Sequence, residues 1–162
     1  MQATHVVGVA DMKLSAEDGD SIITYALGSC LGITVYDPEA RVGGMLHAML
    51  PQSSIDSKKA EENPYMFVDT GGPELFRQCY RIGGKKERLI VIVAGGACAR
   101  GAEEDDYFQI GKRNFVMLRK LLWKNGVLIN AHDVGGSCPR TMTLDIQTGD
   151  VSIRTDGITR KL

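Results

Sequence analysis

The chain has 162 residues, 43% of them hydrophobic, and a formal net charge of −1. That length suits one well-packed core, so we expect a single domain over residues 1–162. Acidic and basic residues are interspersed, which predicts no binding surface for nucleic acid or a membrane. No apolar run reaches the ~18 residues of a spanning helix. The first residues also lack the pattern of a secretion signal, so we expect a cytoplasmic protein without membrane insertion.

The first third of the chain is predicted to be β-structure. Residues 5–14 are rich in strand formers, and residues 21–27 form a second expected strand. Two further apolar segments, 30–37 and 41–50, flank Asp37-Pro38, which fits the first two positions of a type I turn. These two segments are therefore predicted to pair as a hairpin.

The rest of the chain alternates predicted helices and strands. The expected elements are a polar surface loop (52–63), a helix from Pro73 to about Arg81 with Asp69 or Thr70 as cap and a stop at Gly83-Gly84, a buried central strand (88–97), a loop (98–109), a long helix (111–126), and three strands (127–134, 140–146 and 150–155). This order predicts an α+β fold. We expect a layered α/β/β sandwich with mixed, largely antiparallel sheets and two main helices.

The predicted hairpin brings a cysteine and a histidine together. With the turn centred after Pro38, Cys30 lies directly opposite His47, at a distance where a thiol and an imidazole can share a proton. The imidazole could then accept the thiol proton and stabilise the reactive thiolate. Gly28 and Ser29 precede the thiol and could direct backbone N–H groups at a substrate oxyanion. The alternative is that Cys30 is a small buried hydrophobic residue.

Two further groups of polar residues bear on this site. Thr24 lies on the adjacent strand, where its hydroxyl could orient the His47 ring, although a threonine in a strand needs no such role. A rival constellation is His132, Asp133 and Cys138, gathered around one glycine turn. The sequence has no CxxC or HxxxH spacing, so no metal site is predicted.

The hairpin and later blocks resemble one family. The blocks are "LGSCLGITVYDP", "GGMLHAMLP", "IGKRN", "GVLINAHDVGG" and the "TGDV" hairpin, and together they span nearly the whole chain. They resemble the CheD family of chemoreceptor glutamine deamidases in bacterial and archaeal chemotaxis. The resemblance implies that Cys30 is the nucleophile, His47 the base and Thr24 the residue that orients the base. The segments "VIVAGGA" and "GGSCPR" depart from the family pattern, but neither contains Cys30, His47 or Thr24.

The resemblance also implies a reaction and partners. The Cys30 thiolate would attack a receptor glutamine, ammonia would leave, and water would hydrolyse the thioester to glutamate, with no cofactor. Receptor methyl esters could be hydrolysed in the same way. The implied partners are the cytoplasmic helices of chemoreceptors and a CheC-type phosphatase of the phosphorylated response regulator. The alternative function is a non-catalytic binding module that regulates this phosphatase.

Overall fold

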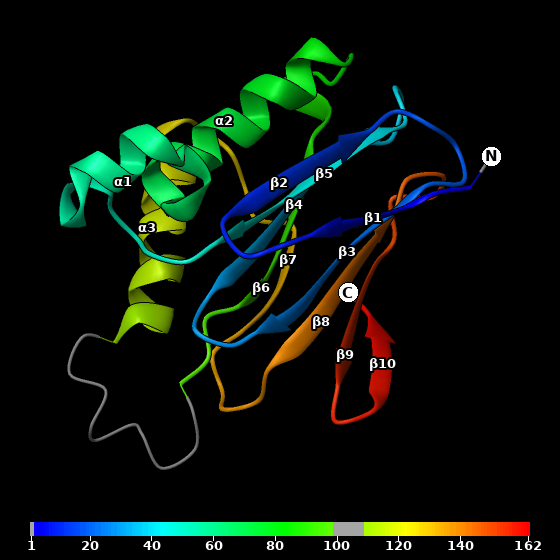
Figure 1. Ribbon diagram of the computed structural model, residues 1–162. Helices are drawn as coiled ribbons and strands as arrows, with labels where there is room; N and C mark the ends of the chain where they lie inside the picture. The colour runs from blue at the N-terminus through cyan, green and yellow to red at the C-terminus, as the bar shows by residue number, and fades with distance from the viewer. Residues whose placement is uncertain (1, 99–108) are drawn as a thin grey trace.

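The structure is a computed structural model that describes residues 2–98 and 109–162. Two five-stranded sheets are stacked, and the helices cover the free face of one of them (Figure 1). This arrangement confirms the predicted α+β fold with α/β/β layers. The expected loop at 98–109 lies almost entirely outside the described residues.

The two sheets contribute different layers. The outer sheet consists, in spatial order, of β1 (Thr4–Val7), β3 (Ser21–Leu27), β8 (Arg140–Asp145), β9 (Val151–Thr155) and β10 (Ile158–Lys161). The central sheet consists of β2 (Asp11–Ser15), β5 (Val42–Ala48), β4 (Leu31–Asp37), β6 (Ile90–Gly95) and β7 (Ala131–Val134). The β1–β3 and β6–β7 pairs are parallel, whereas the other strand pairs are antiparallel. The sheets are therefore mixed and largely antiparallel, as predicted.

Helices cover the far side of the central sheet. They are α1 (Ser57–Glu62), α2 (Val68–Arg81) and α3 (Ile110–Lys124), with short 3-10 helices at Ser53–Ile55, Pro64–Met66 and Lys86–Arg88. No helix in the described ranges is long and apolar enough to cross a membrane.

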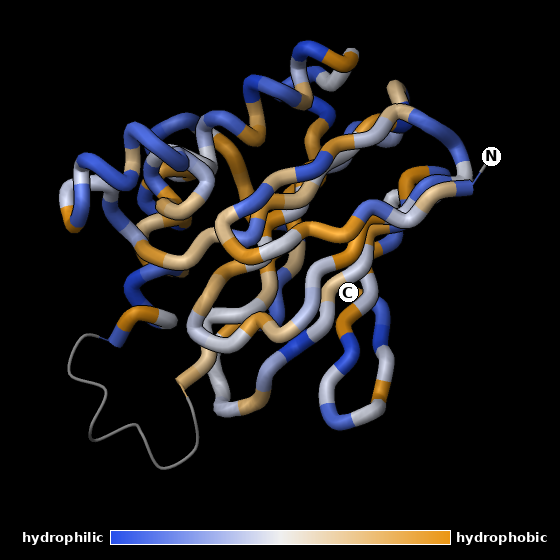
Figure 2. The backbone as a smooth tube through the Cα atoms, viewed as in Figure 1, coloured by the Kyte–Doolittle hydropathy of each residue, from blue (hydrophilic) through white to orange (hydrophobic). Residues whose placement is uncertain are grey.

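The central sheet is buried on both faces. One apolar layer lies between it and the helices, and includes Leu31, Ile33, Leu75 and Leu118. The second layer, here called the inter-sheet core, consists of Val7, Ile22, Leu27, Tyr36, Met45, Ile92, Ala94, Met142, Leu144, Ile146, Val151 and Ile153. Figure 2 shows the resulting concentration of apolar residues along the strands. Because both faces of β4 and β5 are covered, neither strand needs the polar alternation of a half-exposed sheet.

The first long helix begins earlier than predicted. It starts at Val68 and not at Pro73. Phe67 and Val68 are fully buried, which fixes the start of the helix there. The expected cap, Asp69, instead accepts hydrogen bonds from the backbone and hydroxyl of Ser53. Gly71 is needed in this helix, since a side chain there would press against Leu46. The end at Arg81 agrees with the prediction.

Three other differences are local. The predicted loop at 52–63 contains the short helix α1, which begins after Asp56, whose carboxylate accepts a hydrogen bond from Lys59 N. The first predicted strand is divided between β1 and β2, which belong to different sheets. β10 was not predicted; its four residues are all exposed, so it has no apolar pattern by which a strand is found.

Candidate active site

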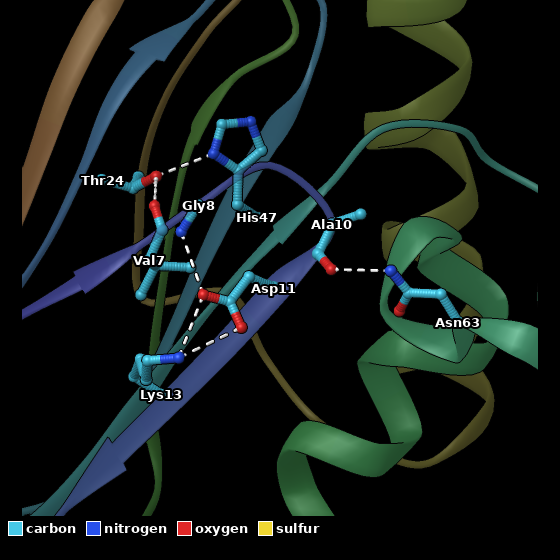
Figure 3. A network of polar contacts seen from close by, with 8 residues as sticks. All are labelled: Val7, Gly8, Ala10, Asp11, Lys13, Thr24, His47 and Asn63. Atoms are coloured by element: carbon cyan, nitrogen blue, oxygen red, sulfur yellow. Dashed lines mark hydrogen bonds and ion pairs between the residues drawn. The ribbon is translucent and has the colours of Figure 1, made fainter.

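A buried imidazole is held between the two sheets. His47 projects from β5, is 1% exposed, and faces Thr24 on β3 of the outer sheet. The Thr24 hydroxyl lies 2.7 Å from His47 Nδ1 and donates to the Val7 carbonyl at 2.8 Å (Figure 3). Because its own proton is committed to Val7, the hydroxyl oxygen accepts from Nδ1–H. The neutral ring therefore carries its proton on Nδ1 and its lone pair on Nε2.

The other ring nitrogen is available for proton transfer. His47 Nε2 is buried and has no hydrogen-bond partner among the described residues. Burial lowers the pKa of His47, while the negative charge of Asp11 acts in the opposite direction. A neutral imidazole with one unpartnered nitrogen is suited to accept a proton.

Cys30 lies in the connection between β3 and β4 and is half-buried. Its side chain packs against the inter-sheet core, on the side of the central sheet to which His47 also points. Burial raises the pKa of the Cys30 thiol. Burial thus acts against charge on both the thiol and the imidazole, and whether His47 stabilises a Cys30 thiolate stays a prediction.

The predicted pairing of Cys30 with His47 is wrong by two residues. Gly32 lies opposite His47, and the ladder runs from Leu31–Ala48 to Asp37–Val42. The cause is the length of the turn, which contains four residues, 38–41, with Arg41 in the left-handed region at φ 55°. A shift of two residues keeps the same face of the strand, so Cys30 remains on the His47 side but lies diagonally and beyond the ladder.

The backbone that leads to Cys30 is fixed by its carbonyl groups. The Gly28 carbonyl accepts from Ala97 N at 2.8 Å, and the Cys30 carbonyl accepts from Gly96 N at 2.9 Å. Gly95 adopts φ 108°, and a side chain there would collide with the Cys30 carbonyl. Gly28 has open space where a side chain would point. The role of the Gly28 and Ser29 N–H groups toward substrate stays a prediction.

The turn between β1 and β2 supports His47 and was not foreseen in the sequence. Ala10 N donates to the His47 carbonyl at 2.9 Å, and Asp11 lies opposite His47 on β2. The Asp11 carboxylate accepts from Gly8 N at 3.0 Å, which closes the turn next to His47 (Figure 3). In the sequence, residues 5–14 look like one strand, so nothing indicated that the chain turns at residues 8–10 and places Asp11 opposite His47.

Asn114 on α3 is a second residue that sequence reasoning missed. It is fully buried, and its Nδ2 donates to the Ser29 carbonyl at 2.9 Å and to the Met49 carbonyl at 3.0 Å. A signal was present, because Asn114 shares one face of the helix with Leu118 and Leu122. A polar residue on a core-facing line of a helix indicates a hydrogen-bonding role.

The rival constellation is not assembled. Cys138 Sγ lies 3.6 Å from Asp156, whereas Asp133 is paired with Arg140 and Arg160. His132 instead packs against the Phe115 ring, with centroids 5.3 Å apart. Across residues 2–98 and 109–162, no three His, Cys, Asp or Glu side chains converge as a metal site would require.

The fold and the candidate site together define a class. A thiol on the same side of the sheet as a buried imidazole, whose Nδ1 is held by a hydroxyl, supplies the groups that cysteine hydrolases use, although Cys30 makes no hydrogen bond to His47 Nε2 in this structure. The chain is thus a candidate cysteine hydrolase built on an α/β/β sandwich.

Comparison with known proteins gives the family. The family model for CheD, described as chemotactic sensory transduction, matches residues 49–155. A probable chemoreceptor glutamine deamidase CheD 1 of Syntrophus aciditrophicus is 48% identical, over 94% of both chains. A probable chemoreceptor glutamine deamidase CheD of Solibacter usitatus is 46% identical, over 97% of this chain and 92% of the relative. A similarly named protein of the archaeon Thermococcus kodakarensis is 38% identical, over 91% and 90%. The chain belongs to the CheD family.

The match of the family model begins after His47, so it does not contain Thr24, Cys30 or His47. The alignment with the Syntrophus relative includes residues from the 24–47 segment, because it covers 94% of this chain and fewer residues than this segment lie outside it.

Proposed function

We propose that this protein is a cysteine-dependent deamidase that converts glutamine side chains of chemoreceptors to glutamate. The observation that carries the proposal is the Thr24–His47 hydrogen bond, which leaves Nε2 as a buried proton acceptor on the side of the sheet where Cys30 lies. The printed names of the relatives support a receptor glutamine as the substrate.

The first half-reaction forms a thioester. As the Cys30 sulfur attacks the carboxamide carbon, His47 Nε2 takes the thiol proton, so that neither group must be charged beforehand. The imidazolium then protonates the departing nitrogen, and the C–N bond breaks to release ammonia. Thr24 keeps the ring in one orientation through both transfers, because its hydroxyl continues to accept from Nδ1–H.

The second half-reaction restores the thiol. Water attacks the thioester carbon while His47 Nε2 accepts its proton, and the C–S bond breaks to leave glutamate. The proton returns to sulfur, and the neutral pair is recovered. Backbone N–H groups of Gly28 and Ser29 are proposed donors to the oxyanion in both steps.

The test is deamidation of a receptor cytoplasmic fragment by the wild type and by Cys30→Ala. Ammonia release and the mass gain of an amide-to-acid change are measured together. The expected result is loss of turnover in the variant with unchanged thermal unfolding, since Cys30 is only half-buried. Cys138→Ala, which removes a half-buried thiol elsewhere, is the matched control and should keep full activity. Wild-type turnover by Cys30→Ala would sink the proposal.

The same site is also proposed to hydrolyse receptor methyl esters. Attack of Cys30 on such an ester would release methanol, and an assay of methylated receptor fragments with Cys30→Ala as control tests this activity.

A CheC-type phosphatase is the proposed protein partner. The alternative function is a binding module that regulates this phosphatase. If Cys30→Ala stimulates the phosphatase while the wild type deamidates no receptor, the alternative is correct.

A further inference from the structure

We infer that Asn114 is a positioning residue, which holds the segments that carry the nucleophile and the base at a fixed separation. The inference rests on the proposed function of Cys30 and His47. It is carried by one side chain on α3 that reaches two carbonyls, Ser29 O at 2.9 Å and Met49 O at 3.0 Å. Ser29 directly precedes Cys30, and Met49 lies two residues after His47.

The position of these carbonyls explains why a bridge is needed there. The β4–β5 ladder ends at the Leu31–Ala48 pair, so Cys30 lies just outside the last paired residues. Beyond a ladder, neighbouring segments lose the backbone bonds that fix their spacing. The Asn114 amide replaces these bonds and also joins the segments to a helix that Leu118 and Leu122 anchor in the core.

Asparagine is chemically suited to this position. Its Nδ2 carries two N–H groups, one for each carbonyl, and two facing acceptors fix which end of the amide is nitrogen. Asn114 Oδ1 is buried without a partner in the described part of the chain, and this unmet acceptor makes the residue a poor choice for stability alone. Aspartate has the same shape, but its oxygens would face two carbonyl oxygens.

Loss of the bridge should affect chemistry more than folding. The Ser29 carbonyl would be released while the Gly28 and Cys30 carbonyls kept their bonds to Ala97 N and Gly96 N, so the segment would stay in place but lose its link to Met49 and the His47 strand. A misplacement of about 1 Å can lower the rate of an oriented reaction by about 10²-fold. The exposed surface that meets the receptor would be unchanged, so KM should change little while kcat falls.

The experiment compares Asn114→Ala and Asn114→Asp with two controls. Asn125→Ala removes an exposed amide at the C-cap of the same helix, where its side chain donates to Leu121 O. Thr34→Val removes a different buried hydrogen bond, from the Thr34 hydroxyl to the Ile92 carbonyl at 2.9 Å. For each variant, kcat and KM for receptor-fragment deamidation and the thermal unfolding midpoint are measured.

The expected result is a fall in kcat of about 10²-fold for Asn114→Ala. We expect a larger fall for Asn114→Asp, and near-normal kcat for both controls. Equal kcat in Asn114→Ala and in Thr34→Val would overturn the inference. If Asn114→Ala does not fold, Asn114→Ser, which keeps one donor, replaces it and should give an intermediate kcat.

A readout without turnover separates this inference from the proposed function. The rate at which iodoacetamide alkylates Cys30, followed by peptide mapping, should increase in Asn114→Ala, because the segment that carries the half-buried thiol loses one of the three carbonyl bonds that hold it. Alkylation of Cys138 should not change. If the wild type deamidates no receptor, the proposed function fails while this rate still tests the bridge. An unchanged Cys30 rate would overturn the bridge alone.

Discussion

At the scale of single residues, the state of His47 follows from two contacts. The Thr24 hydroxyl fixes the proton on Nδ1, and burial of the ring disfavours a second proton on Nε2. Cys30 is likewise kept as a thiol by burial. The pair therefore begins without charge and separates charge only during attack on the substrate, when the proton moves from sulfur to nitrogen.

Thr24 can be tested by changing only its hydroxyl. Thr24→Val should lower kcat by about tenfold or more, since a buried Nδ1–H without an acceptor costs about 1–3 kcal/mol and the ring can adopt the wrong tautomer. Thr24→Ser retains the hydroxyl and should keep most of the activity. The measurement is kcat for receptor deamidation in both variants. A Val variant as active as the Ser variant would show that the hydrogen bond has no catalytic effect.

The pH dependence of activity should reflect the lowered pKa of His47. The neutral ring is the active form, so kcat/KM should be lost only as pH falls through a value below ~6.5, the ordinary pKa of histidine. The charge of Asp11 opposes this lowering, so Asp11→Asn should move the acid limb to still lower pH. The profiles of wild type and variant are compared between acid and neutral pH. A limb that moves upward in Asp11→Asn would contradict the assignment of His47 as base.

At the scale of elements, the β4–β5 hairpin depends on one buried carboxylate. Asp37 accepts hydrogen bonds from the backbone N–H groups of Glu39, Ala40 and Lys85. It also forms an ion pair with Arg88 at 2.8 Å. Burial by itself would raise the pKa of Asp37. The bond from Arg88 and the bonds from the backbone N–H groups outweigh it and hold the pKa well below its usual range. The carboxylate thus joins the turn to the segment that enters β6.

Removal of this charge should destabilise the fold without changing the reaction. Asp37→Asn should lower the free energy of unfolding by about 3 kcal/mol at pH 7, because Arg88 loses its buried partner. The stabilisation is present above the unfolded pKa of ~3.9 and is lost as pH falls through the folded pKa. Urea unfolding of both proteins at pH 7 and below pH ~4 should therefore show a gap that narrows in acid. A gap that widens in acid would refute this role of Asp37.

The hairpin also shows what the sequence could and could not predict. Asp37 and Pro38 correctly identified the turn, since their backbone and side-chain preferences are local. The number of turn residues was wrong, because the left-handed conformation of Arg41 is imposed by strand twist and pairing, not by its residue type. The register of the hairpin could therefore be known only from the structure. That Cys30 and His47 lie on the same face could be predicted from the sequence.

At the scale of the whole molecule, the layers were predictable and the supports of the site were not. Buried strands and amphipathic helices in a mixed order indicate an α/β/β sandwich from pattern alone. Asn114 and Val7 reach the site from positions far from it in the chain, through contacts that only the packing of sheets and helices creates. Exposed β10 and capped α1 were missed because neither has an apolar period.

The register of the hairpin differs from the predicted one by two residues, which keeps every side chain on its face. This determines where inserted or deleted residues can be tolerated. The loop at 38–41 lies away from the site, so changes in its length can be absorbed where the backbone is not paired. One residue added within β5 before His47 would instead turn the imidazole to the helix side, where Leu46 packs. Two added residues would restore the face but move the ring by about 7 Å along the strand, out of reach of Thr24. Length variation in this protein should therefore be tolerated in the hairpin loop and excluded from the strand between Val42 and His47.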